Sequence, residues 1–176
     1  LQLLLGIEKF NTDKVINIEG IFNSCSEINY LDLSNFNTSN VADMSFMFSG
    51  CNKLKKIVGI ENFNTEQVAN MESMFESCFE ILHLDLSNFN TSNVTNMSYM
   101  FNKCYKMKEI IGIETFNTDK VIDMEAMFKL CSELEYLDIS NFNTSNVKNM
   151  SYMFSSCSKL QLLLGIEKFN TDKVIN

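Results

Sequence analysis

One phrase recurs along the whole chain and constrains its fold more than any other feature. The tripeptide Phe-Asn-Thr begins at seven positions, which are separated alternately by 26 and 27 residues: Phe10, Phe36, Phe63, Phe89, Phe116, Phe142 and Phe169. A period of this length is typical of solenoid proteins, in which each unit buries its apolar side against its neighbours. The sequence therefore predicts a stack of similar turns, with its core spread along the axis of the stack.

Two kinds of unit alternate and together form a double unit of 53 residues. In even units the stretch before Phe-Asn-Thr reads as in residues 84–89, whereas odd units carry one extra residue, Gly59 in residues 57–63. We therefore expect a single solenoid domain over residues 1–176, with about six and a half turns. Because the chain begins inside a unit, we also expect it to be a fragment of a longer repeat array.

Within a unit, the hydrophobic pattern indicates one strand and one helix. Residues 84–86 alternate apolar and polar side chains, as a strand does. Val94, Met97, Phe101 and Cys104 then recur at the spacing of one face of a helix. The predicted fold class is α/β, a leucine-rich-repeat-like solenoid with one short parallel strand plus one short helix per turn. The alternative is a mostly-β solenoid in which the methionine-rich segment is extended.

A longer motif carries a resemblance to a known family. The consensus reads Met-Phe-x-x-Cys-x-x-Leu-x-x-Leu-Asp-Leu-Ser-x-Phe-x-Thr-Ser-Asn-Val-x-x-Met, and residues 137–147 and 153–157 show it well. This pattern resembles the BspA-like leucine-rich repeats and, more closely, the 26-residue surface-protein repeat of mycoplasmas and lactobacilli. The resemblance implies a surface-exposed lipoprotein or wall-anchored protein linked to adhesion, host-matrix binding or antigenic variation. It implies no shared catalytic site.

Charge and hydropathy exclude several classes of partner. The net charge is −8 and all 14 basic residues are lysines, which argues against binding to nucleic acid or to anionic membrane surfaces. No apolar run approaches the roughly 18 residues that a membrane span needs, so we expect this part of the chain not to be inserted in a membrane.

The repeated apolar and sulfur-containing residues are expected to form the core. One cysteine falls in each turn, at Cys25, Cys51, Cys78, Cys104, Cys131 and Cys157. No Cys-x-x-Cys occurs, and a single histidine, His83, cannot complete a zinc site, so we expect buried reduced thiols and no metal or other cofactor. The paired methionines and the phenylalanine series from Phe10 to Phe169 receive the same interpretation, and His83 is expected to be an incidental surface residue.

One polar stripe is a candidate binding surface. The outward position of each predicted strand is acidic, at Glu8, Asp32, Glu61, Asp85, Glu114, Asp138 and Glu167. Two interpretations remain open: a solvated strand face that prevents aggregation, and a face that binds a cationic partner. A calcium site is disfavoured, because the dense Gly-Gly-x-Gly-x-Asp repeat is missing.

The two ends of the chain share their sequence. Residues 1–17 and 160–176 are identical and are offset by 159 residues, or three double units. This identity indicates a recently copied block, and predicts that Ile follows Asn176 in a parent protein. Both ends lack the polar caps that solenoids normally carry, so we expect end-to-end self-association.

Together these patterns predict a non-enzymatic, extracellular cell-surface module for protein recognition or for adhesion to host or matrix components. The expected partner is a protein ligand, such as a component of the host extracellular matrix, or a cationic surface. The alternative is a structural stalk or antigenically variable spacer with no specific ligand. An enzyme is disfavoured, because catalytic sites need unique convergent groups and no Ser, Cys or His departs from the repeat in that way.

Overall fold

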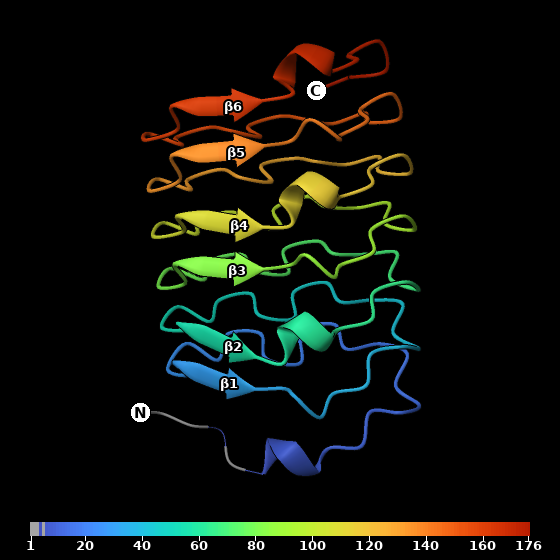
Figure 1. Cartoon of the computed structure of the whole chain (residues 1–176), viewed down its shortest axis with the longest axis vertical. Coiled ribbons are helices and arrows are strands. Elements are labelled where there is room, and N and C mark those ends of the chain that lie inside the picture. Colours follow the sequence, from blue (N-terminus) through green and yellow to red (C-terminus); the bar gives the residue numbers. More distant parts are fainter. Residues whose placement is uncertain (1–3, 5) are drawn as a thin grey trace.

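The protein is a stack of similar turns, with short strands aligned along one side (Figure 1). The computed structural model describes Leu4 and residues 6–176. Its strands are β1 (Tyr30–Asp32), β2 (Lys56–Val58), β3 (His83–Asp85), β4 (Glu109–Ile111), β5 (Tyr136–Asp138) and β6 (Leu162–Leu164). Its short 3-10 helices, which lie in the odd turns, are η1 (Ile7–Lys9), η2 (Ile60–Asn62), η3 (Ile113–Thr115) and η4 (Ile166–Lys168).

The strands pair in parallel, but they do not form one continuous sheet. Three separate two-stranded sheets join β1 to β2, β3 to β4 and β5 to β6. In each strand the central residue points inward: Leu31 lies opposite Ile57, and both are buried. A second parallel ladder of single bridges runs through Asn17, Asp43, Asn70, Asn96, Asp123 and Asn149. The stacked parallel-strand repeat that the sequence predicts is therefore confirmed.

The extra residue of the odd units explains why the strands pair two by two. Gly59 has φ of +89° and precedes η2. A Cβ atom on Gly59 would lie 2.4 Å from the backbone nitrogen of Ser34, in the preceding even turn. Only glycine allows this backbone conformation together with so close an approach. The odd turn thus packs tightly against the even turn before it, while no strand pairing links β2 to the following β3.

The predicted helix is wrong. Over residues 94–104 the structure has consecutive turns, and backbone N–H groups alternate between two kinds of acceptor. The Met100 N–H donates within its own turn, to the Met97 carbonyl at 3.3 Å, whereas the Tyr99 N–H donates to the Glu125 carbonyl of the next turn at 2.7 Å. An α-helix would use every one of these groups internally. The turns instead use half of them to join neighbouring units.

The spacing of the apolar residues predicts a helix because the observed turns bury the same sequence positions that one face of a helix would bury. Met97, Met100, Phe101 and Cys104 are all buried, at the i, i+3, i+4 and i+7 spacing that a helix would also give. The backbone differs at positions such as Tyr99, whose φ of +58° is incompatible with a right-handed helix. The alternative, a mostly-β solenoid, is closer to the observed fold, although the methionine-rich segment is turned rather than extended.

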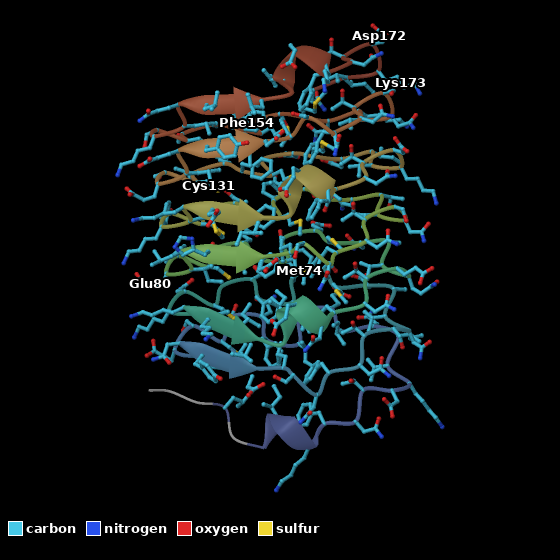
Figure 2. The ribbon with its side chains drawn as sticks, viewed as in Figure 1. Met74, Glu80, Cys131, Phe154, Asp172 and Lys173 are labelled. Atoms are coloured by element: carbon cyan, nitrogen blue, oxygen red, sulfur yellow. The ribbon has the colours of Figure 1, made fainter. Side chains whose placement is uncertain are left out.

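The interior is filled by columns of equivalent side chains, as the sequence predicts. Figure 2 labels Met74, Cys131 and Phe154 among the side chains of the stack. One phenylalanine from each turn stacks on the next, with ring centroids 5.4–5.8 Å apart, at Phe22, Phe48, Phe75, Phe101, Phe128 and Phe154. This is not the series that begins at Phe10, in which Phe10 and Phe36 stack at 6.4 Å.

The cysteines are free thiols, and each inner one bonds to the turn before it. The Cys78 Sγ lies 3.2 Å from the Phe48 carbonyl oxygen, and Cys104 repeats the contact with Phe75. Within the described part of the chain, no helix has the length and hydropathy to cross a membrane.

Candidate functional site

The structure splits the predicted acidic stripe into two sets. The three aspartates are the last residues of the strands in the even repeat units: Asp32 in β1, Asp85 in β3 and Asp138 in β5. The odd-turn members lie in 3-10 helices beyond the strands: Glu61 in η2, Glu114 in η3 and Glu167 in η4. The residues paired with these aspartates come from the strands of the odd repeat units and are apolar: Val58 in β2, Ile111 in β4 and Leu164 in β6. The expected single column of outward strand carboxylates is therefore wrong, because the inserted glycine moves each odd-turn acid off the strand. The Glu8 side chain lies outside the described residues.

The strand aspartates have local hydrogen-bond partners. Asp85 Oδ1 accepts hydrogen bonds from the Ser87 backbone N–H at 3.0 Å and from the Ser87 hydroxyl at 2.6 Å. These bonds stabilise the charged carboxylate and lower the pKa of Asp85. Ser34 and Ser140 do the same for Asp32 and Asp138. The aspartates thus stabilise the turn that follows β1, β3 and β5 through these hydrogen bonds, and their carboxylates lie on the surface.

A groove of about 730 Å³ lies over β3, β4 and β5, where β4 and β5 are not paired. Its lining residues are His83, Lys108, Glu109, Ile110, Ile111, Ile113, Glu114, Glu133, Glu135, Tyr136, Leu137 and Asp138. Two residues of the predicted stripe, Glu114 and Asp138, are brought together here. Asp32, Glu61, Asp85 and Glu167 are outside this lining.

The groove combines a negative rim with exposed apolar surface. Five carboxylates line it, against one lysine and one histidine. Ile111 and Tyr136 are 40% and 49% exposed, so both present apolar surface to a ligand. His83, which the sequence suggested was incidental, lies with Nδ1 3.3 Å from Glu109 Oε2. The arrangement favours a ligand that carries positive charge beside an apolar group.

Electrostatics within the groove centre on one tyrosine. The pKa of Tyr136 is raised, first by desolvation and then by the negative charges of Asp138 and Glu114. Its hydroxyl donates a hydrogen bond of 3.5 Å to Asp138 Oδ2. A cation placed beside Tyr136 would be attracted by the carboxylates of Asp138 and Glu114. The lining contains no serine, threonine or cysteine, so it offers no hydroxyl or thiol nucleophile of those types.

A second acidic cluster, which the sequence analysis missed, lies along the consecutive turns. Glu72 accepts a 3.0 Å hydrogen bond from Asn96 Nδ2, and its pKa is raised first by desolvation and then by neighbouring carboxylates. The Tyr99 hydroxyl donates a hydrogen bond to Glu125 Oε1. The signal was present in the sequence as glutamates between the paired methionines, at Glu72 and Glu125, and as asparagines just outside a pair, at Asn96 and Asn102.

This cluster is a network of paired side chains. Asn102 is buried and donates from Nδ2 to Glu76 Oε1 at 2.9 Å, while its Oδ1 has no hydrogen-bond partner. Among the described residues, no group of three or more histidine, cysteine, aspartate or glutamate side chains is placed to hold a metal ion. We therefore treat the groove as the candidate site.

Comparison with known proteins gives one match. Residues 2–112 and, again, residues 79–176 match a family model described as "Mycoplasma protein of unknown function, DUF285". Neither the curated proteins nor the solved structures with which the chain was compared contain a match. The two overlapping matches together span nearly the whole chain, which therefore belongs to the DUF285 family of mycoplasma proteins.

Proposed function

We propose that this protein is a non-enzymatic recognition module of the cell surface, which binds a cationic segment of a partner protein in the groove over β3, β4 and β5. One observation carries the proposal: five carboxylates and exposed apolar side chains line a single concave site, and of these carboxylates Glu133 is paired with Lys159 at 2.7 Å. A site that joins charge to apolar contact is suited to specific binding.

The chemistry of the groove selects the partner. Opposite charges steer association and fix the orientation of a bound segment, while buried aromatic surface supplies much of the affinity. Tyr136 is the principal aromatic group of the lining, and Ile111 adds aliphatic surface beside it. We therefore expect a segment in which lysine or arginine lies next to an apolar residue. A neutral or acidic segment should bind poorly.

Two further observations support a surface protein of the BspA-like type. The match to a mycoplasma family agrees with the resemblance of the repeat motif to the mycoplasma surface repeat. The repeated motif also places a buried leucine at the centre of β1, β3 and β5, namely Leu31, Leu84 and Leu137. Location at the cell surface, adhesion to host matrix and kinship with BspA-like repeats are parts of this proposal.

The test is saturable binding to a panel of host matrix proteins and of short peptides that differ in charge. The chain offers a matched pair of substitutions, because Asp138 lines the groove and Asp32 does not. Each of the two carboxylates accepts a hydrogen bond from the backbone N–H of the serine two residues later, so their local surroundings are alike. Asp138→Asn should weaken binding of a cationic peptide about fivefold to tenfold, the effect of one exposed to half-buried charge contact. Asp32→Asn should leave it unchanged.

Equal effects of the two substitutions would contradict binding in the groove. A second pair strengthens the comparison: Glu114→Gln changes the groove, whereas Glu167→Gln changes the equivalent residue of another turn. If no matrix protein or peptide binds saturably, the alternative of a structural spacer is favoured. The near-identity of successive turns is the observation that supports that alternative.

A further inference from the structure

The separation of strands that holds the groove has an equivalent elsewhere in the described part of the chain. Figure 1 shows the strands in pairs, with wider spacing between β2 and β3 and between β4 and β5, and the groove lies at the second of these separations. A shift of 53 residues, one double unit, carries each groove residue onto the first separation. We call the residues reached by this shift the β2–β3 slot: residues 30, 55–58, 60, 61, 80 and 82–85.

The backbone follows the same course at the slot and at the groove. The glycines that precede η2 and η3 have φ of +89° and +87°. A hydrogen bond of the same kind crosses each separation: Asn88 Nδ2 donates to the Glu61 carbonyl at 2.8 Å, and Asn141 Nδ2 donates to the Glu114 carbonyl at 2.6 Å. The slot and the groove therefore differ in their side chains rather than in their framework.

One ion pair is also common to the two places. Lys106 Nζ lies 2.7 Å from Glu80 Oε1, and Lys159 Nζ lies 2.7 Å from Glu133 Oε2. In both cases the hydrogen bond from the lysine is the largest cause that lowers the pKa of the glutamate. Because these pairs match, they cannot make the slot and the groove differ in binding.

Charge distinguishes the slot from the groove. The groove has five carboxylates and one lysine, which gives a formal charge of −4 with its histidine neutral. The slot has three carboxylates, Glu61, Glu80 and Asp85, and two lysines, Lys55 and Lys56, which gives −1. Each place also contains one tyrosine and one histidine, at exchanged positions. A cationic ligand is therefore attracted more strongly to the groove.

Two positions account for the whole difference in charge. Glu109, the exposed first residue of β4, corresponds to Lys56 in β2. Glu135, exposed just before β5, corresponds to Leu82, which is 42% exposed. The two glutamates come from opposite sides of the separation between β4 and β5. A cationic side chain bound there meets a carboxylate on each side, whereas in the slot it would meet an ammonium group and an aliphatic group.

We propose that Glu109 and Glu135 determine the specificity of the groove for a cationic segment, and that Lys56 and Leu82 prevent the slot from binding the same segment. This proposal rests on the function proposed above, because it concerns the selectivity of the same groove. The solenoid framework thus supplies equivalent binding positions one double unit apart, and two side chains decide which of them is used. The wild-type chain accordingly binds the segment at the groove and not at the slot.

The test gives the slot the charges that it lacks. Lys56→Glu combined with Leu82→Glu raises the slot to five carboxylates and one lysine, and neither residue lines the groove. The probe is a short lysine-containing peptide with an adjacent apolar residue, titrated into the chain by calorimetry. The stoichiometry should rise from about one peptide per chain in the wild type to about two in the double variant, because both places then offer the same charge complementarity.

A matched double variant controls for net charge. Ile122→Glu combined with Lys148→Glu makes the same two kinds of change at exposed residues of neighbouring turns, outside both the groove and the slot. It should leave the stoichiometry at the wild-type value if local charge decides binding. Asp85→Asn, added to the Lys56→Glu and Leu82→Glu changes, should weaken only the new site, which locates that site in the slot.

The reverse exchange provides a second, independent variant. Glu109→Lys combined with Glu135→Leu gives the groove the charges of the slot and should abolish saturable binding of the peptide. In variants that urea denaturation shows to be folded, a missing second site or an undiminished reverse variant would overturn this proposal and leave the function of the groove intact. Two equal sites in the wild type would also overturn it. Absence of saturable binding by the wild type would instead contradict the proposed function, and this proposal with it.

Discussion

Gly112 lies so close to Ser87 that a Cβ atom on the glycine would sit 2.3 Å from the serine Cα. This contact joins each odd turn to the even turn before it. The same relationship recurs at Gly59 with Ser34 and at Gly165 with Ser140. The chain therefore consists of tightly joined pairs of turns, and the groove lies between the β3–β4 pair and β5, where the strands separate.

This contact predicts a large cost for Gly112→Ala. The methyl group would add steric overlap to an unfavourable positive φ, for a loss of about 2–4 kcal/mol in the free energy of unfolding. Gly6→Ala is the control, because Gly6 has a φ of +89°, close to the +87° of Gly112, with nothing within 4 Å of the added Cβ. It should lose only about 1 kcal/mol. Urea denaturation measures both, and equal losses would contradict the role of the close approach.

The turns can be distinguished from a helix by a glycine substitution. Ser77 has φ of +60°, and the equivalent position of the preceding turn is Gly50. Ser77→Gly should therefore stabilise the protein by up to about 1 kcal/mol, because it removes backbone strain. In a helix the same change would destabilise by roughly 0.5–1 kcal/mol. Ser49→Gly, at a position without a positive φ, is the control and should destabilise.

The thiols should differ in reactivity according to burial. Burial raises the pKa of Cys51 to about 12, and it also raises the pKa values of Cys78, Cys104 and Cys131 well above the ordinary thiol value. Because the thiolate is the reactive form, these four should resist a thiol reagent until the protein unfolds. Cys25 and Cys157 are half-buried and should react first. Mass spectrometry of the labelled native protein counts the reacted thiols, and six rapid reactions would contradict the packed core.

Acid should destabilise the protein through its strand aspartates. The pKa values of Asp32, Asp85 and Asp138 are lowered in the folded state by their serine partners. Their stabilisation is therefore complete above the ordinary aspartate pKa of 3.8 and is lost as the pH falls through the lowered folded values. The pKa of Glu72 is raised, so its protonation acts in the opposite direction.

Ser87→Ala tests this pH dependence, because it removes the hydroxyl hydrogen bond to Asp85. Urea denaturation between about pH 5 and pH 2 should show a smaller loss of stability on acidification in the variant than in the wild type. An unchanged pH dependence would show that this hydrogen bond does not set the pKa of Asp85.

Much of the fold was predictable from the sequence, because a repeat constrains every turn at once. The period placed the strands, and the columns that contain Met97 and Cys104 are buried as expected. The Asn-Thr pairs accept backbone N–H groups near a turn, as Thr12 and Asn37 do. The helix was not distinguishable from consecutive turns, since both bury the same spacing. Only the backbone reveals the left-handed residues such as Tyr99.

The candidate site was less predictable, because it depends on register between turns. The sequence singled out Glu114 and Asp138, but it placed them in one strand column with Glu61 and Asp85. The inserted Gly112 moves Glu114 into η3 and breaks that column. The carboxylates of Glu133 and Glu135 reach the groove from the segment before β5, which no pattern within a single unit could show.

The most direct test of the account is the affinity of the wild-type chain for a short lysine-containing peptide with an adjacent apolar residue, measured by calorimetry across a salt series. Binding in a groove with five carboxylates should be saturable and should weaken steadily as salt screens the charges. Asp138→Asn should reduce both the affinity and its dependence on salt. Absence of saturable binding, or an affinity insensitive to salt and to Asp138→Asn, would contradict the proposed function.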